Sequence, residues 1–163
     1  MNILLEAFKQ SFDLVLMLDR DLFEILFLSL KVSFVSLFFS CLIGLPLGTF
    51  LAIKNFWFRD NILIIFNTLM GLPPVVVGLI VYLIISRSGP LGWLGILYTP
   101  TAMIIAQMIL IIPIIVSLSA QAIEEVHLEY KHLFLSLVVP SHKAIKAYLF
   151  DARYSILTVM LAG

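Results

Sequence analysis

Charged residues are scarce in this sequence. They make up 12% of its 163 residues, about half the share found in an ordinary soluble domain. Hydrophobic residues make up 62%, and ten Lys and Arg are balanced by ten Asp and Glu. No basic surplus therefore indicates nucleic acid as a partner. The composition excludes an ordinary soluble domain and indicates a protein embedded in membrane lipid.

The sequence also lacks the residue patterns of common enzymes. The single cysteine, Cys41, lies in an apolar run and can form no intrachain disulfide. There is no glycine-rich phosphate loop, Cys-x-x-Cys pair or nucleophile elbow. We therefore expect neither catalysis nor a cofactor, and any ATP hydrolysis that drives this protein must occur on another subunit.

Two Glu-x-x-His tetrads, at Glu124 to His127 and Glu129 to His132, raise the question of a metal site. In di-iron bundles such tetrads lie on facing helices. Here they would share one helix, on which an offset of five residues turns the second pair about 140° from the first. We interpret both as parts of a solvated charged face and expect no metal ion.

Apolar stretches organise most of the chain. Residues 25–53, 61–86 and 99–120 are predicted to be transmembrane helices, since about 20 apolar residues cross the hydrocarbon, and a fourth span is predicted to start at residue 154. Lys31 lies near the start of the first stretch, where it can snorkel to the headgroups or, alternatively, face a pathway. Residues 1–24 carry five acidic side chains and predict an amphipathic segment, with a disordered leader as the alternative.

The second apolar stretch is interrupted by Pro73 and Pro74, which cannot continue a regular helix. At membrane depth, the carbonyls freed by such a break are tolerated where a neighbouring helix or a watery cavity satisfies them. We therefore predict a translocation pathway here, together with the polar Gln107 of the third span. The candidate pathway residues are Asn67, Thr68, Pro73, Pro74, Val75, Gly78 and Gln107.

The basic residues predict the orientation of the chain. If the three spans alternate, six Lys and Arg fall on one side and three, Lys9, Arg20 and Arg87, fall on the other. The more basic side is expected to be cytoplasmic, so the amino terminus and the loop 86–98 would face outward. The cytoplasmic set is Lys54, Arg59, Lys131, Lys143, Lys146 and Arg153.

The predicted cytoplasmic loop, residues 121–153, has apolar residues at helical spacing among its charges. An amphipathic helix is expected over 120–137, Pro140 cannot continue it, and Ser141 is a plausible cap for a second short helix. Two helices joined by a sharp turn would present a rigid surface to a soluble partner. The alternative is a loop that only packs on the membrane surface.

Several segments carry a resemblance to a known family. They are Leu72–Gly78, Ser86–Gly92, Tyr98–Ala102, Ala106–Gln107, Ser136–Pro140 and Asp151–Tyr154. They resemble segments of the inner-membrane permease subunits of bacterial type I ABC importers. The resemblance runs from about Ile25 to Gly163, and within that family the chain is most similar to tungstate permeases. Molybdate permeases share the Pro-Pro-Val-Val-Val-Gly stretch but fit the later segments less well.

The resemblance implies an all-α, polytopic transmembrane helical bundle of the MetI-like class in the bacterial cytoplasmic membrane, with residues 25–163 as the permease domain. It implies a homodimer that docks an ABC ATPase inside and a substrate-binding protein outside, and imports tungstate. A molybdate or other oxyanion permease, a non-transporting scaffold and a truncated, non-functional permease stay open. The implied ATPase-docking residues are Leu137, Val138, Pro140, Ser141, Lys143, Ile145, Asp151 and Arg153.

The chain departs from the family pattern in two ways. Val138 stands where the docking loop has a glycine, and His132, Leu133 and Phe134 stand where it has acidic and small residues. Because a β-branched valine resists positive φ, we expect Pro140 to provide the turn or the coupling to be weakened. The family is also expected to continue through at least one further span after Gly163.

Overall fold

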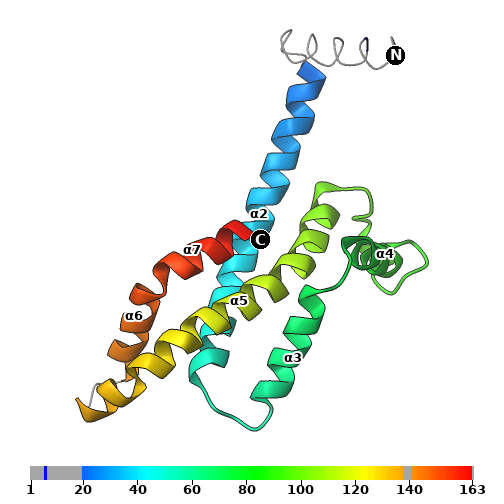
Figure 1. Ribbon diagram of the computed structural model, residues 1–163. Helices are drawn as coiled ribbons and strands as arrows, with labels where there is room; N and C mark the ends of the chain where they lie inside the picture. Colours follow the sequence, from blue (N-terminus) through cyan, green and yellow to red (C-terminus); the bar gives the residue numbers. More distant parts are fainter. Residues whose placement is uncertain (1–5, 7–19, 138–140, 163) are drawn as a thin grey trace.

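A computed structural model describes Glu6, residues 20–137 and residues 141–162, and within these residues the chain is helical and has no strand. Two long helices, α2 (Arg20–Ile53) and α5 (Pro100–Ser136), pack against each other at the centre of the molecule (Figure 1). The shorter helices lie on either side of this pair. They are α3 (Arg59–Met70) and α4 (Pro74–Ile85) on one side, and α6 (Ser141–Asp151) and α7 (Arg153–Ala162) on the other.

Among the described residues, α2 and α5 are each long and apolar enough to cross a membrane. α3 and α4 have 12 residues each and qualify only as a pair, which is bent by 100° at the break between them. The predicted break at Pro73 and Pro74 is therefore present. It stays a prediction that residues 61–86 cross the membrane as one broken span.

A stripe of small residues lets α2 approach α5 closely. These residues recur every fourth position on α2, which places them on one face of the helix, and all of them are buried. A Cβ atom added at Gly44 would lie 2.8 Å from Ile115 Cγ2, and one at Gly48 would lie 2.8 Å from the Val116 carbonyl oxygen. Small residues serve the same purpose in many membrane helix pairs. The small-residue stripe consists of Ser36, Ser40, Gly44, Gly48 and Ala52.

α5 is longer than the predicted third span. It continues from Pro100 to Ser136, so residues 99–120 and the amphipathic helix predicted over 120–137 form one continuous helix. The reason is local, because no proline or glycine occurs between Pro113 and Ser136 and nothing interrupts the backbone hydrogen bonds there. The predicted cytoplasmic loop thus begins as an extension of a membrane helix.

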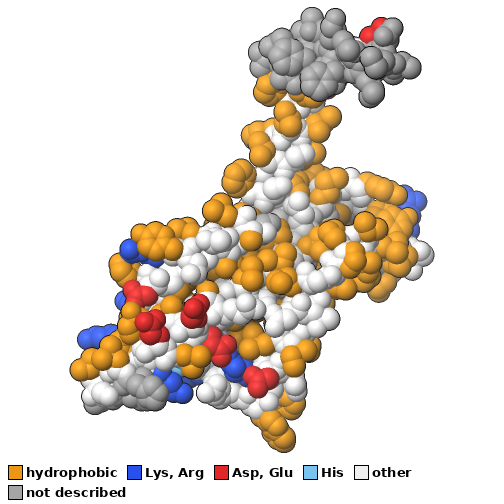
Figure 2. Space-filling model, in the orientation of Figure 1, with side chains coloured by type: hydrophobic (Ala, Val, Ile, Leu, Met, Phe, Trp, Pro, Cys, Tyr) orange, Lys and Arg blue, Asp and Glu red, His pale blue; other side chains and the backbone are white. Residues whose placement is uncertain are grey.

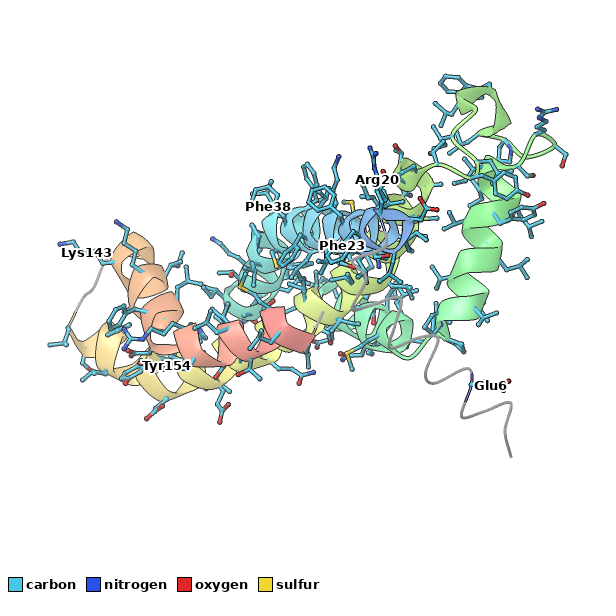
Figure 3. All side chains as sticks on the ribbon, turned by 90° about the horizontal axis from the view of Figure 1, so that it is seen from above. Glu6, Arg20, Phe23, Phe38, Lys143 and Tyr154 are labelled. Carbon is cyan, nitrogen blue, oxygen red and sulfur yellow. The ribbon has the colours of Figure 1, made fainter. Side chains whose placement is uncertain are left out.

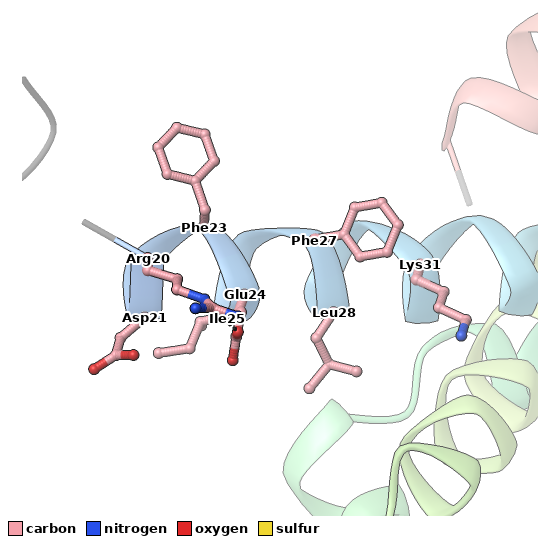
Figure 4. Close-up of a pocket in the computed structure, with 8 residues that line it drawn as sticks. All are labelled: Arg20, Asp21, Phe23, Glu24, Ile25, Phe27, Leu28 and Lys31. Carbon is pink, nitrogen blue, oxygen red and sulfur yellow. Dashed lines mark ion pairs between the residues drawn. The ribbon is translucent and has the colours of Figure 1, made fainter. Parts of the chain in front are cut away.

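The amino-terminal part of α2 protrudes from the rest of the molecule (Figure 1). The helix begins at Arg20, so the last residues of the predicted segment 1–24 belong to it, while residues 1–5 and 7–19 lie outside the described residues. Figure 4 shows the surface hollow here. The described residues that line it, including Phe27 and Lys31, all belong to this helix. Lys31 is exposed, and Arg20 makes an exposed ion pair with Glu24, at 3.5 Å.

Charged side chains gather at the opposite end of the molecule. Figure 2 shows most of the visible Lys, Arg, Asp and Glu side chains over the end where α2 finishes and α6 lies, while orange hydrophobic side chains are spread among white surface over the rest of this face. The exposed hydrophobic residues include Phe34 at 67% and Phe38 at 64% of full exposure on α2. An apolar belt with one charged end is the arrangement expected of a chain surrounded by lipid.

Candidate functional site

The corner between α3 and α4 is the first element of the candidate site. α3 ends at Met70, Pro73 has extended backbone angles (φ −62°, ψ 134°), and Pro74 is the first residue of α4. Proline suits this position because the first amide of a helix has no partner within the helix. The Gly71 amide donates to the Thr68 carbonyl at 3.1 Å. The chain thus turns without a regular helix, and the amino-terminal end of α4 lies at the corner.

α4 has one buried face and one open face. Val77, Val81 and Ile85 are buried against residues that include Ala102 and Ala106 of α5. On the open face, Val75 is 81% exposed, and a Cβ atom added at Gly78 would meet nothing within 4 Å. Four candidate pathway residues, Pro73, Pro74, Val75 and Gly78, therefore lie exposed along one side of the corner.

Asn67 and Thr68 lie near the end of α3 but make different contacts. The Ser117 hydroxyl on α5 donates a hydrogen bond to the Asn67 side-chain oxygen. The Thr68 hydroxyl donates to the Ile64 carbonyl of its own helix at 2.8 Å. Asn67 thus ties α3 to α5, whereas Thr68 is satisfied locally, as hydroxyls in membrane helices often are.

Gln107 does not join the corner residues. Its side-chain amide forms a hydrogen bond with the Ser36 hydroxyl of α2 at 2.9 Å, beside a hollow of ≈ 300 Å³ lined by apolar residues such as Leu37 and Met160. α4 packs on α5 at Ala106, one position before Gln107. The structure therefore places Gln107 in the α2–α5 interface, on another face of α5 than the one that meets α4.

α6 packs on the lower part of α5 through an aromatic cluster. Tyr148 is 3% exposed, and its ring lies edge-on to His127 at 5.0 Å and against Phe134 at 5.4 Å, measured between ring centroids. Ala144 and Ile123 are buried in the same cluster. Burial raises the pKa of the Tyr148 phenol, so this ring stays neutral and serves as a packing element. The cluster fixes α6 against α5.

The candidate docking residues lie in different environments. Leu137 is 64% exposed, and Lys143, Asp151 and Arg153 are exposed, with Arg153 stacked over Phe150 at 4.1 Å. Figure 3 shows Lys143 at the outer end of the molecule. Val138 and Pro140 lie outside the described residues, and Ser141 is the first residue of α6. The predicted turn around Val138 is thus untested.

Ile145 faces the membrane helix α2 and not the outer end of the molecule. It lines a hollow of ≈ 550 Å³ together with residues such as Leu45 and Phe50 of α2. A side chain in this position contributes to the junction between α6 and α2. Its predicted role in docking a partner stays a prediction.

No group of three or more His, Cys, Asp or Glu side chains in the described part of the chain could hold a metal ion. Of the two tetrads, Glu124 is paired with Arg59 at 2.6 Å, and His127 packs against Tyr148. The arrangement offers an exposed helix corner on one side and a surface helix on the other.

Comparison with known proteins decides the family. The model of the family described as binding-protein-dependent transport system inner membrane component matches residues 44–152. The chain belongs to this family. The matched region contains the α3–α4 corner, nearly all of the candidate site residues and α6, so the resemblance carried by residues 72–78 and 136–140 is confirmed at the level of the family.

Three curated relatives are permease proteins. A probable anion ABC transporter permease protein of Haloferax volcanii is 37% identical over 135 residues, covering 83% of this chain and 58% of the relative. The tungstate uptake system permease protein TupB of Peptoclostridium acidaminophilum is 39% identical over 119 residues, covering 73% and 52%. TupB of Campylobacter jejuni is 31% identical over 160 residues, covering 98% and 67%.

This chain thus spans between about half and two thirds of the length of these permeases. No solved structure gives a significant match. The predicted similarity to tungstate permeases is confirmed, and the family is one of membrane-embedded transport subunits.

Proposed function

We propose that this chain is the permease subunit of an ATP-driven oxyanion importer, with tungstate as the favoured ion. The observation that carries the proposal is the α3–α4 corner, whose exposed Pro73, Pro74, Val75 and Gly78 lie within the region that matches the permease family. The names of the two TupB relatives support tungstate. Molybdate stays the alternative, because both are tetrahedral divalent anions.

The corner suits an anion pathway without a fixed positive charge. α4 begins at Pro74, so the positive end of its helix dipole lies at the corner, where it can attract an anion. No Lys or Arg occurs between Arg59, at the far end of α3, and Arg87, so neither helix supplies a basic side chain next to the corner to hold the ion tightly. A pathway of this kind passes the anion and leaves its recognition to a binding protein outside the membrane.

Two further partners complete the mechanism that we propose. A second copy of the chain would cover the open face of α4, where Val75 is 81% exposed. An ATPase would bind α6 from the cytoplasmic side, next to the charged end of the molecule. Closure of the ATPase would move α6 and α5, and the corner would open alternately to the two sides of the membrane.

Oxyanion uptake tests the function as a whole. In cells from which the gene is deleted, tungstate accumulation should fall, and the complete reading frame that contains this chain should restore it. Molybdate and sulfate accumulation, measured in parallel by elemental analysis, identify the preferred ion. A non-transporting scaffold is the alternative, and it predicts unchanged accumulation of all three ions after deletion.

Substitution of Gly78 by tryptophan tests the pathway. Because the space around Gly78 is open in this subunit, we expect Gly78→Trp to leave the amount of membrane-inserted protein unchanged while the bulky ring obstructs the corner. Tungstate uptake should fall at least about tenfold, which corresponds to a barrier raised by about 1.4 kcal/mol.

The matched control for this variant is Phe38→Trp, which places the same ring on an exposed position of α2 (Figure 3). Uptake by the control should equal that of the parent. If Gly78→Trp also transports like the parent, the pathway does not pass this face of α4.

Replacement of Leu137 by aspartate tests ATPase docking. Leu137 is an exposed apolar residue at the end of α5, and a charge there would disrupt an apolar contact with a partner. We expect Leu137→Asp to reduce the amount of ATPase that co-purifies with the permease from detergent-solubilised membranes. Leu128→Asp, at a position 60% exposed on the same helix, is the control and should retain the ATPase. Equal recovery with both variants would exclude docking through Leu137.

A further inference from the structure

Arg59 connects three helices at the charged end of the molecule. Its side chain is only 12% exposed, and its Nη2 lies 2.6 Å from Glu124 Oε1 on α5. Its Nε donates a hydrogen bond of 2.7 Å to the Leu51 carbonyl in the last turn of α2. Nη1 pairs with the exposed Asp60 at 3.1 Å. The planar guanidinium can make these contacts together because its donors point in fixed directions.

The α5 side of the Arg59–Glu124 ion pair lies next to residues that pack against the surface helix α6. Glu124 follows Ile123, which is 0% exposed and packs in the cluster that holds Ala144 and Tyr148 of α6. Three residues further along α5, His127 lies against the Tyr148 ring. A shift of α6 would therefore displace the segment of α5 that carries Glu124.

The Arg59 side of the ion pair is connected to the α3–α4 corner through helix α3. Arg59 is the first residue of α3, and α3 ends at Met70, three residues before Pro73. α3 has no buried residue. It is held by the half-buried Ile62, Leu63 and Phe66, which pack against α2 and α5, and by the hydrogen bond between Asn67 and Ser117 of α5. A helix with so little buried surface moves with the residues that hold it to its neighbours, of which Arg59 lies at its start and Asn67 near its end.

We infer that Arg59 is a positioning residue that couples α6 to the α3–α4 corner through its ion pair with Glu124. This inference rests on the proposed function. The ion pair joins α5 to the start of α3, with the Arg59 side chain 12% exposed and the Glu124 side chain 35% exposed. It transmits a displacement of α5 to α3, and the 12-residue helix α3 carries it to the corner. Arg59 itself contacts neither the anion nor the ATPase.

The experiment measures transported anion and hydrolysed ATP in the same preparation. The complete permease, its ATPase and its binding protein are reconstituted in lipid vesicles, and tungstate uptake is divided by the ATP consumed. Glu124→Gln removes the charge of the acceptor and keeps its shape. Arg59→Lys keeps the charge but cannot reach both Glu124 and the Leu51 carbonyl with a planar fork.

We expect both variants to transport at least about fivefold less anion per ATP, the lower range of coupling between two sites. The amount of ATPase bound and the rate of ATP hydrolysis should stay at the parental level. Asp60→Asn is the matched control, because it alters the exposed partner of the same arginine, 83% exposed at its side chain, and should transport as many anions per ATP as the parent.

Two results would overturn the coupling role. One is a ratio of transported anion to hydrolysed ATP that stays parental in Glu124→Gln and Arg59→Lys. The other is a smaller yield of assembled complex whose remaining molecules keep the parental ratio, since this shows a purely structural contact. If the parental complex transports no oxyanion at all, the result contradicts the proposed function itself, and the coupling role, which rests on it, is overturned as well.

Discussion

Replacing Gly48 by leucine is expected to prevent the chain from accumulating as a folded membrane protein. Gly48 is buried in the small-residue stripe of α2, where an added Cβ atom would already lie 2.8 Å from the Val116 carbonyl oxygen and against the Ser119 hydroxyl. Two of the three nearest atoms belong to the α5 backbone, which cannot relieve the clash by a change of rotamer as a side chain can. A leucine must therefore push α2 and α5 apart along the main interface of the molecule.

Overpacking typically costs about 1–3 kcal/mol and occasionally more, and a clash with backbone atoms is expected to lie at the upper end, which is a large part of the stability of a small domain. The measurement is the yield of monodisperse protein after detergent extraction, followed by its thermal unfolding. Gly78→Leu is the matched control, because the same substitution at Gly78 meets nothing within 4 Å and should give parental yield. A normal yield and unfolding temperature for Gly48→Leu would show that α2 and α5 do not pack in this way.

Replacing Tyr148 by alanine is expected to release α6 from α5. Tyr148 is 3% exposed and supplies the ring that both His127 and Phe134 contact. Removing a large buried aromatic side chain costs about 3 kcal/mol or more through lost burial and the cavity left behind. Because every 1.4 kcal/mol is tenfold in an equilibrium, the detached form of α6 should become roughly a hundredfold more populated.

A thiol placed at Ala144, which is 7% exposed, reports this detachment through its labelling rate, with Cys41 replaced by serine to remove the background. Phe150→Ala is the control, because this aromatic residue lies on the same helix but is 62% exposed and should leave the rate unchanged. Equal labelling of the two variants would show that Tyr148 does not hold α6 in place.

Much of the helical organisation follows from local signals in the sequence. Apolar runs predicted α2 and α5, and Pro73 with Pro74 predicted the break between α3 and α4, because a proline removes a backbone donor wherever it lies. The boundaries were less accurate. α2 begins at Arg20 and not at residue 25, and α5 runs to Ser136, because helix ends depend on packing as well as on composition.

The candidate site was predicted only in part. The corner residues Pro73, Pro74, Val75 and Gly78 lie together, since they are neighbours in sequence and the break exposes them. Gln107 was grouped with them because it is polar and lies in an apolar span, but it faces Ser36 of α2. Which face of α5 meets α2 is a tertiary property, and no local pattern specifies it.

Arg59 and the small-residue stripe were missed for related reasons. Arg59 was interpreted only as a basic residue of a cytoplasmic loop, and its partner Glu124 lies 65 positions further along the chain. The stripe has a sequence signal, since Ser36, Ser40, Gly44 and Gly48 recur at intervals of four. That spacing places them on one side of a helix, and their burial against α5 became visible only in the structure.

The sequence by itself determined that this protein is a helical membrane chain, where its second apolar stretch breaks, and to which family it is similar. These properties depend on composition and on neighbouring residues, which act over a few positions of the chain. The tertiary structure decided that α4 keeps an open face at the corner, that α6 is held by Tyr148, and that Arg59 joins α2, α3 and α5. Those properties require segments far apart in sequence to meet, and contacts of that kind are specified by the packing of whole helices.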